Sequence, residues 1–534
     1  MKTTIKNLIL SAVLVVGGAS CVDLDTAPYD RETDLTYWEE DPEAAVKALN
    51  TCYTYLGNMD EQLYCEAMTD NAYTKQPNDA TQNIGNGSYS TADPYVKKVW
   101  DGRYTGIRMC NELLENIDRV PDLDPELKKR YIGEAKVLRA YNYYELYTKF
   151  GDVPYTTKVL SIKESMSIAR TAKATVIANV LADLDEVING NYLPTSYDAD
   201  NKGRITRWAA MAIKAKIYLF EGNWTQVKNI TSTIMTEGGF KLFGSYAGLF
   251  EIANEYNSEV ILDAQYRPTS REHQMMYVFL PPTLGGYSQL SPLQELVDSY
   301  IMLDGKTIKE TGTSFDESNP YANRDPRLKA TVMYTGNSYT LADGTEVVIN
   351  CEKGEGKDGY GVGSDCSATG YYIKKYWDNT YRATLYSGLN PILIRYADIL
   401  LMNAEALAEL GELDKMAWDA TIKPIRDRAG FTLTSAVEFP EGASKDKLIE
   451  IVRNERRSEL ALEGHRHKDI IRWRIADDVL NGWCHGLKTN EVVGTDNGYV
   501  RVENRAFNAN KHYLWPIPQA ERDLNGNLVQ NPNW

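Results

Sequence analysis

The sequence lacks the residue patterns on which most metal-dependent and hydrolytic enzymes rely. Its 534 residues include five histidines and seven cysteines, with no C-x-x-C pair, no H-E-x-x-H and no G-x-S-x-G. The common zinc modules, zinc proteases and serine hydrolases are therefore excluded. We expect no cofactor, although loop carboxylates leave room for a structural cation such as calcium.

Excess positive charge and long apolar runs are also lacking. The 58 Lys and Arg residues are outnumbered by 74 Asp and Glu residues, and the net charge of −16 would repel a nucleic-acid backbone. No segment reaches the roughly 18 to 20 uncharged residues that a membrane-spanning helix needs. With 43% hydrophobic and 25% charged residues, the composition is that of a globular protein with a large core.

The first 20 residues have the pattern of a secretory signal. Lys2 and Lys6 precede an apolar stretch, and the small residues 17–20 lead directly to Cys21. This arrangement resembles a bacterial lipobox, which predicts acylation of Cys21 and a lipidated tether over residues 21–40. The protein would then be anchored to the cell outer membrane and face the exterior. A secreted protein in which Cys21 is incidental is the alternative.

Helical periodicity dominates the chain outside its middle part. Asp41 and Asp124 each stand before a Pro-Glu pair, which predicts an N-cap and a helix start at both places. The second helix should run over 127–150 and end at Gly151. An apolar stripe over 100–117 predicts another helix, which should pair with it as an antiparallel hairpin.

Two later segments predict helix pairs that resemble tetratricopeptide repeats. One pair turns at Gly222 and continues over 224–236, and the other turns at Gly411 and continues over 413–429. Such pairs bury their apolar faces by stacking on neighbouring pairs. The predicted fold class is therefore all-α dominated, with a tetratricopeptide-like helix-pair scaffold.

The middle of the chain, about 240–388, has a different composition. It is rich in Gly, Pro, Asn, Ser, Thr and Tyr and contains strand-like runs at 260–262 and 346–350. We predict a single domain over 41–534, in which the scaffold (about 41–240 and 389–534) carries this stretch as a large loop-rich insertion with short β-strands. Cys351 and Cys366 flank a glycine-rich loop and could form a disulfide, whereas Cys110 should be a buried free thiol.

Segments spread over nearly the whole chain resemble the SusD/RagB-like family of outer-membrane nutrient-binding lipoproteins. They are Glu66–Asn71, Trp100–Asn111, Gly133–Pro154, Arg204–Ala210, Asn323–Leu328, Arg395–Asp398, Asn454–Arg466 and Leu514–Pro518. The charges in the segment 454–466 fall at helical spacings that favour structural ion pairs over catalysis. The resemblance implies a non-catalytic protein that binds oligosaccharide or polysaccharide and delivers it to a SusC-like TonB-dependent transporter.

Carbohydrate recognition combines flat apolar rings for the sugar faces with planar polar groups for the hydroxyls. The chain has 36 Tyr beside 10 Phe and 10 Trp, so tyrosine is the main source of such rings. Family members place ligand contacts in loops that correspond to residues 70–95 and to the insertion. The candidate ligand-binding residues are Asp70, Asn71, Tyr73, Tyr89, Tyr95, Tyr287, Trp377 and Tyr381.

Two other classes of function stay open on the sequence. A glycoside hydrolase on a helical scaffold would need two carboxylates roughly 5 to 9.5 Å apart across a cleft. A surface lipoprotein could also bind peptide or protein with its helical repeats. A glycan that is bound but not cleaved would support the non-catalytic glycan-binding protein over the glycoside hydrolase.

Overall fold

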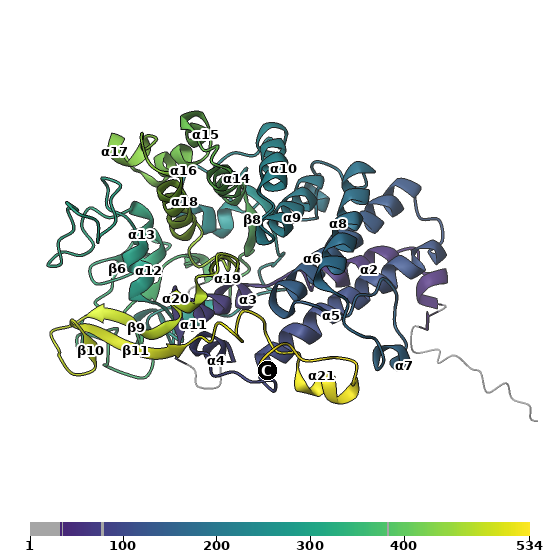
Figure 1. The fold of residues 1–534 in the computed structure, drawn as a ribbon, viewed down its shortest axis with the longest axis horizontal. Coiled ribbons are helices and arrows are strands. Elements are labelled where there is room, and N and C mark those ends of the chain that lie inside the picture. The colour runs from purple at the N-terminus through teal and green to yellow at the C-terminus, as the bar shows by residue number, and fades with distance from the viewer. Residues whose placement is uncertain (1–32, 35, 76–79, 382–383) are drawn as a thin grey trace, which may run out of the picture.

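The scaffold is a stack of helices that contact one another in chain order (Figure 1). The computed structural model describes residues 33–34, 36–75, 80–381 and 384–534, so the predicted leader, Cys21 and most of the tether lie outside the described residues. Contacts run from α2 to α5, α6, α8, α9 and α10 in turn. The helices of this part are α2 (Ala44–Tyr53), α3 (Met59–Tyr64), α4 (Ala80–Asn86), α5 (Pro94–Asn116), α6 (Pro125–Phe150), α7 (Ile162–Ser165), α8 (Lys173–Asn189), α9 (Arg207–Phe220) and α10 (Trp224–Glu237).

The rest of the chain returns to this stack after the insertion. Helix α14 packs on α10, and α18 packs on α14. The later helices are α11 (Met275–Phe279), α12 (Gln294–Ser299), α13 (Pro326–Thr331), α14 (Tyr396–Leu410), α15 (Lys415–Ala420), α16 (Ile422–Ala429), α17 (Thr434–Val437), α18 (Lys445–Glu459), α19 (Arg466–Arg472), α20 (Ala476–Val479) and α21 (Gln519–Leu524). Single helical turns occur at η1 (Thr36–Glu40), η2 (Cys65–Met68), η3 (Ile117–Arg119), η4 (Ala199–Asn201), η5 (Gly248–Phe250), η6 (Ile252–Asn254), η7 (Pro282–Leu284) and η8 (Asn379–Tyr381).

Local capping explains where α6 begins and ends. The Asp124 side chain accepts a hydrogen bond from the Leu127 amide, and Pro125 occupies the first helical position, as predicted. The helix ends at Gly151, whose backbone (φ 72°, ψ −119°) lies in a region that only glycine adopts readily. At the first predicted start, by contrast, α2 begins after Glu43, and the Asp41 side chain accepts from the Glu43 amide in a turn outside the helix.

The two predicted tetratricopeptide-like pairs are present, but the second differs from its prediction. Helices α9 and α10 form the first pair across Gly222. The single helix predicted over 413–429 is instead two helices, α15 and α16, which meet at Thr421 (φ −125°, ψ −70°). Pro424 accounts for the break because proline has no amide hydrogen to bond to the carbonyl four residues earlier, and its ring clashes with that carbonyl.

The insertion is built from short antiparallel strands, the short helices α11, α12 and α13, and single helical turns. Its strand β2 pairs with β8 of the scaffold, which ties the two parts together. The other pairs are β1 with β3, β4 with β7 and β5 with β6, and β10, β11 and β9 form a ribbon near the C-terminus. The strands are β1 (Ala72–Thr74), β2 (Val260–Asp263), β3 (Leu290–Pro292), β4 (Val332–Met333), β5 (Ser338–Thr340), β6 (Glu346–Val348), β7 (Tyr372–Ile373), β8 (Ile392–Arg395), β9 (Asn481–Lys488), β10 (Thr495–Asp496) and β11 (Tyr499–Ala506). Both strand-like runs of the sequence are thus strands, and the predicted fold class is confirmed.

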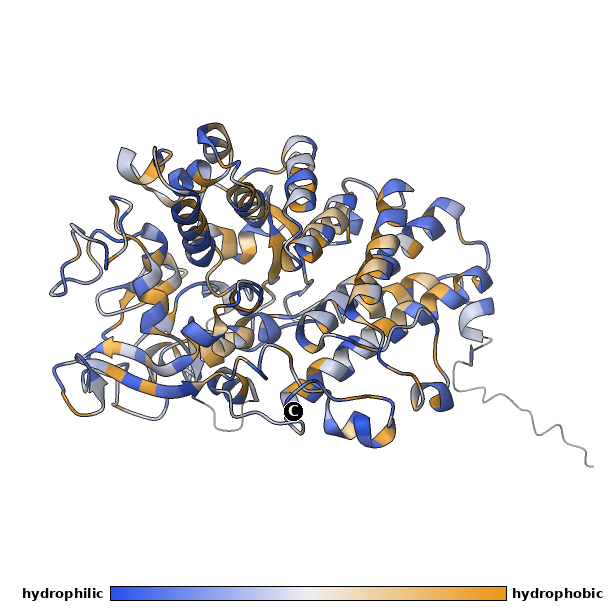
Figure 2. Ribbon diagram, viewed as in Figure 1, coloured by the Kyte–Doolittle hydropathy of each residue, from blue (hydrophilic) through white to orange (hydrophobic). Residues whose placement is uncertain are grey.

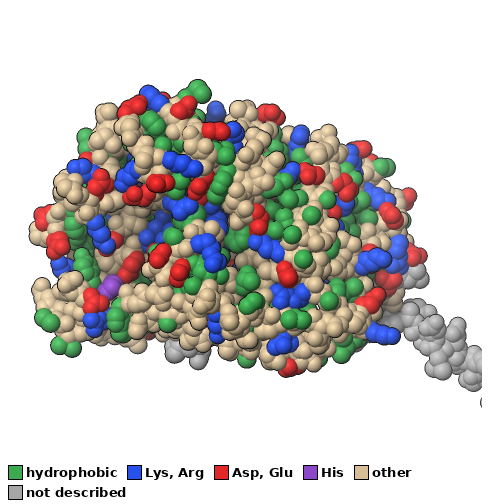
Figure 3. Space-filling view, in the orientation of Figure 1, with side chains coloured by type: hydrophobic (Ala, Val, Ile, Leu, Met, Phe, Trp, Pro, Cys, Tyr) green, Lys and Arg blue, Asp and Glu red, His purple; other side chains and the backbone are tan. Residues whose placement is uncertain are grey.

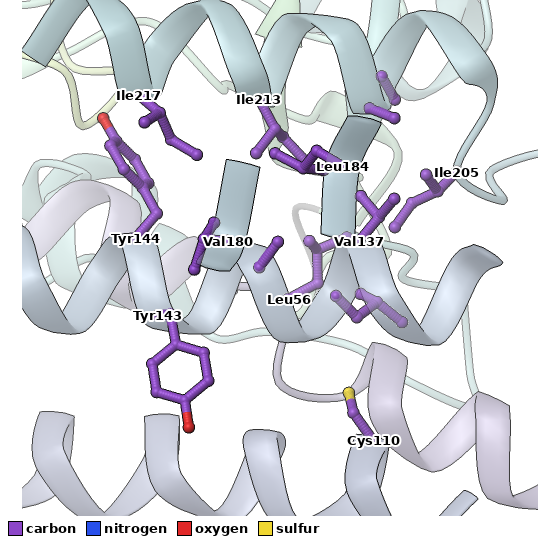
Figure 4. Close-up of a cluster of buried hydrophobic side chains, with 14 of the residues drawn as sticks. Leu56, Cys110, Val137, Tyr143, Tyr144, Val180, Leu184, Ile205, Ile213 and Ile217 are labelled. Atoms are coloured by element: carbon purple, nitrogen blue, oxygen red, sulfur yellow. The ribbon is translucent and has the colours of Figure 1, made fainter. Parts of the chain in front are cut away.

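Two large hydrophobic clusters form the core. One lies between the stacked helices, where the apolar faces of α5, α6, α8 and α9 meet (Figures 2 and 4). The second lies under the insertion and includes side chains from α3, from the insertion and from the segment after α18. Cys110 is a buried free thiol in the first cluster, as predicted, and Cys351 and Cys366 are also free thiols, so they are not joined by a disulfide.

Charged residues of the segment 454–466 form a buried ionic network rather than pairs along one helix. Arg395, from β8, donates to Glu259 at 2.7 Å, Glu459 at 2.6 Å and Glu463 at 2.7 Å. Glu459 also accepts from Arg327 at 2.9 Å. The network therefore joins scaffold and insertion, and the prediction that these charges are structural is confirmed.

Candidate functional site

Three tyrosines of the insertion form an aromatic platform on the surface, which we call the tyrosine triad. Tyr287 stacks on Tyr277, with ring centroids 5.8 Å apart and an interplanar angle of 13°. Tyr386 stands perpendicular to Tyr277 at 6.2 Å and 88°. The Tyr287 side chain is 47% exposed and that of Tyr386 is 37% exposed. The triad thus offers flat apolar surface to solvent where most tyrosines of the chain are covered.

The chain around the triad holds Tyr287 in place. The Tyr287 amide donates to the Tyr277 carbonyl at 2.8 Å, which folds the loop after α11 back over that helix. Gly285 supplies a left-handed backbone (φ 87°). A Cβ atom at Gly286 would lie 2.1 Å from the Leu280 carbonyl oxygen, so only glycine permits this close approach. The stacked geometry is therefore built by the backbone.

Polar groups lie at the edge of the triad. Gln274, an exposed residue before α11, donates its side-chain amide to the Tyr386 hydroxyl at 2.8 Å. Gln274 thus places an amide group beside the Tyr386 hydroxyl, next to the rings. Such an arrangement suits a sugar, whose C–H faces pack on rings while its hydroxyls need donors and acceptors.

Of the sequence candidates, Tyr287 alone is in the triad. Tyr277, Tyr386 and Gln274 were missed, because nothing in the local sequence shows that Tyr386 is folded against α11. The spacing of Gln274 and Tyr277, three residues apart, was the one available signal, since it puts both on one side of a helical turn.

Asp70 and Asn71 are buried and belong to the ionic network, and Asp70 also lines a polar cleft, so their role as ligand contacts stays a prediction. The Asp70 carboxylate accepts from Arg466 at 2.8 and 2.9 Å and pairs with Arg457 at 2.9 Å. Burial by itself would raise the pKa of Asp70, but Arg457 and Arg466 outweigh it and hold the pKa below its ordinary value. Asn71 donates to Glu66 and accepts from Arg457. Their hydrogen-bonding groups are thus occupied by protein partners.

Tyr89 is also buried, at 5% exposed, which corrects its prediction as a ligand contact. Its ring lies 5.0 Å from that of His512 and 4.8 Å from that of Trp534. Both partners come from the C-terminal end of the chain, so this cover is invisible in the sequence around Tyr89. The burial of the phenol raises its pKa above the ordinary value.

The remaining candidates lie outside the triad. Tyr73 is half-buried and accepts from Gln82 at 3.2 Å, and burial raises its pKa to about 12. Tyr95 is half-buried at the start of α5, with its ring 6.2 Å from that of Trp515. Trp377 is half-buried and donates its indole hydrogen to the Thr340 carbonyl. Tyr381 ends η8, and its side chain lies outside what the structure describes.

A polar cleft of about 490 Å³ lies between α12, α18 and the β9–β11 ribbon, on the left of Figure 3. Trp483, 43% exposed, lines it together with Glu295 and Asp298. At its edge His485 bridges Glu295 at 2.7 Å and Asp496 at 3.0 Å, and these carboxylates, Glu295 foremost, raise the pKa of the imidazole. The bridge fastens the ribbon to α12.

Two buried carboxylates with raised pKa values, Asp263 and Glu255, are held by protein donors. Burial raises the pKa of Asp263 to about 6 and that of Glu255 to about 7. The Asp263 oxygens accept hydrogen bonds from the side-chain amides of Gln265 and Asn390. Glu255 accepts one from the backbone amide of Asn390. These carboxylates thus act as structural acceptors. Within the described ranges no group of three or more His, Cys, Asp and Glu side chains could hold a metal ion.

None of the helices in the described part of the chain combines the length and the apolar character needed to cross a bilayer. The face in Figure 3 carries acidic and basic side chains intermixed, without a continuous basic stripe of the kind that nucleic-acid binding favours.

Solved structures share this fold over nearly the whole chain. A SusD-like carbohydrate-binding protein from Bacteroides fragilis has a TM-score of 0.81 and 29% identity, and covers 92% of this chain and 100% of its own. A laminarin-binding SusD-like protein has a TM-score of 0.68 and 24% identity, and covers 92% and 99%. The latter similarity, being below 25% identity, concerns the fold alone.

Sequence comparisons agree with the structural ones. SusD-like protein P25 of Formosa agariphila is 27% identical over 99% of this chain and 98% of its own. A family model described as starch-binding associating with outer membrane matches residues 37–219. The model of the SusD family matches residues 249–534, more than half of the chain, and with the stacked helix pairs and the tyrosine-bearing insertion it shows that this protein belongs to the SusD family.

Proposed function

We propose that this protein is a non-catalytic glycan-binding lipoprotein of the outer membrane that holds oligosaccharides at the tyrosine triad. The observation that carries the proposal is the exposed, parallel stack of Tyr287 on Tyr277 with Tyr386 set at a right angle. A stack of rings edged by Gln274 matches the alternation of apolar faces and hydroxyls on a sugar chain. The carbohydrate-binding character of the relatives supports the same ligand class.

The proposed anchor is the acylated Cys21, and the proposed partner is a SusC-like TonB-dependent transporter that takes up the captured glycan. The described N-terminal residues in η1 lie at the right end of the molecule, whereas α11 lies in its left half (Figure 1). A tether at one end would thus leave the triad free to meet ligand. Each sugar unit should bind weakly, with longer chains gaining affinity through several contacts.

Calorimetric titration of the purified protein with a panel of plant and host oligosaccharides tests the ligand class. We expect binding that strengthens with chain length and no new reducing ends. Replacement of Tyr287 by Ala should weaken binding about tenfold, since exposed aromatic anchors dominate such contacts, and Tyr287→Phe should keep most of the affinity because the ring remains.

Tyr256→Ala is the matched control, because Tyr256 is 40% exposed and lies outside the triad. Equal affinity in Tyr287→Ala and Tyr386→Ala would show that the glycan binds elsewhere. Reducing ends produced at catalytic rates would overturn the non-catalytic proposal. Loss of membrane association in Cys21→Ala, and recovery of a TonB-dependent transporter with the wild-type protein from solubilised outer membranes, test the anchor and the partner.

A further inference from the structure

A large cavity lies apart from the triad, among the ends of α6 and α9, the segment after α19 and the C-terminal tail. Its volume is about 840 Å³, within the range of small-molecule sites. It is lined by Tyr147, Phe220, Arg170, Lys173, Arg474 and Tyr513, among others, and it shares no lining residue with the triad. The walls thus combine aromatic rings with cations in a chain whose net charge is −16.

Two of the cations in this cavity, Arg170 and Arg474, have no carboxylate within ion-pair distance among the described residues. Arg170 donates to the carbonyls of Phe150, Asp152 and Val529 and to the Asn531 side-chain oxygen, all neutral acceptors. None of the ion pairs within 4 Å in the described part of the chain includes Arg474, although the Tyr513 hydroxyl, together with Arg474, lowers the pKa of nearby Asp477. The Arg474 guanidinium lies 3.5 Å from the Tyr513 ring centroid. Four cationic side chains and one carboxylate, that of Asp152, line the cavity, so cations outnumber anions in its lining.

Two further features point to a ligand. The Tyr147 side chain is 1% exposed, and its hydroxyl has no hydrogen-bond partner among the residues that the structure describes. Burial of an unpaired hydroxyl costs free energy, which a ligand hydroxyl would recover. The second feature is Arg474, which has a left-handed backbone (φ 58°) in the position after α19 where glycine is favoured.

We propose that this cavity binds an anionic sugar unit, a pyranose that carries a carboxylate or a sulfate group, as a site separate from the triad. Arg474 and Arg170 attract the anion, and the Tyr147 hydroxyl bonds a ring hydroxyl. The rings of Phe220 and Tyr513 offer apolar surface to the sugar. The inference does not depend on glycan binding at the triad.

Calorimetric titration with glucuronic acid, glucose 6-sulfate and glucose at low salt tests the proposal. At least one of the anionic sugars should bind, and which one does so identifies the charged group, whereas glucose should not. Added salt should weaken the binding. Equal binding of glucose, no binding of either anionic sugar, or equal binding of inorganic sulfate would each overturn the proposal.

Substitutions in the cavity wall test whether the anionic sugar binds there. Arg474→Gly should weaken binding about tenfold without lowering Tm, because glycine suits the left-handed backbone, and Tyr147→Phe should weaken binding while keeping the ring. Lys511→Gln removes a cation that also stacks on a ring, that of Trp534 at 3.9 Å, but does not line the cavity, and should change nothing. Unchanged affinity in both Arg474→Gly and Tyr147→Phe, or lost affinity in Tyr287→Ala, would place the anionic sugar elsewhere.

Discussion

Ion pairs between individual buried side chains hold the insertion to the scaffold. Glu459, fully buried, accepts hydrogen bonds from Arg327, Arg395 and Arg428. Burial by itself would raise the pKa of Glu459, but the guanidinium groups, Arg428 first, hold it below its ordinary value. Neutralising this buried carboxylate costs free energy because Arg327, Arg395 and Arg428 would each lose one of their carboxylate partners in a site that water does not reach.

Replacement of Glu459 by Gln, of nearly equal shape, should therefore destabilise the protein by about 3 to 5 kcal/mol, measured by urea unfolding. Glu450→Gln on the same helix is the control, because Glu450 is exposed and pairs with Lys447 at the surface. Its effect should stay within about 0.5 kcal/mol. A loss below about 1 kcal/mol in Glu459→Gln would mean that the network is not structural.

Tyr89 and Tyr287 are the same type of residue but differ in solvent exposure, so together they test whether burial decides the effect of a substitution on stability. Both are tyrosines in loops that the sequence assigned to ligand binding, but Tyr89 is 5% and Tyr287 47% exposed. Tyr89→Ala should lower stability by about 3 to 5 kcal/mol through the cavity it leaves, whereas Tyr287→Ala should cost less than about 1 kcal/mol. Thermal unfolding of the two variants checks the difference, and equal Tm values would contradict the burial of Tyr89.

The attachment of the β9–β11 ribbon to α12 depends on the protonation of one histidine, His485. His485 lies between Glu295 on α12 and Asp496 on β10, and Arg501 with His485 lowers the pKa of Asp496 to about 2. The imidazole pKa is raised in the folded protein. A raised folded pKa means that the stabilisation is complete below the unfolded pKa of about 6.5 and is lost as the pH rises through the folded value.

The Tm difference between wild type and His485→Gln should accordingly be larger at about pH 5.5 than at about pH 9. His273→Gln is a useful contrast, because burial lowers the pKa of His273 to about 4 and its effect on pH dependence should have the opposite sign. A Tm difference for His485→Gln that grows with pH would show that the bridge does not fasten the ribbon.

Helix boundaries illustrate what local sequence predicts. Asp124 and Gly151 bound α6 as predicted, since a cap and a left-handed glycine act within one turn of the chain. The break between α15 and α16 was missed although Pro424 was visible, because the apolar periodicity continues across it. Local sequence therefore predicts where a helix begins and ends when capping residues, proline and apolar periodicity agree. It does not do so when these signals conflict.

The whole molecule has a core that neither of its parts completes alone. The cluster under the insertion includes Met59 and Leu63 from α3 and Ala461 and Leu462 from beyond α18. We expect an isolated fragment over 240–388 to be unfolded, since it lacks these side chains and the partners of its buried charges. Heteronuclear NMR of the fragment checks this expectation, and a well-dispersed spectrum would contradict it.

The sequence by itself determined the fold class, the first helix pair and the structural role of the charged segment 454–466. These follow from periodicity, capping and charge spacing, which act over a few residues. The family followed from a resemblance of motifs spread along the chain. Only the tertiary structure decided which tyrosines face solvent. Tyr89 is covered by Trp534, and Tyr277 and Tyr386 meet across a loop. Exposure depends on neighbours brought from distant parts of the chain, and no local pattern encodes them.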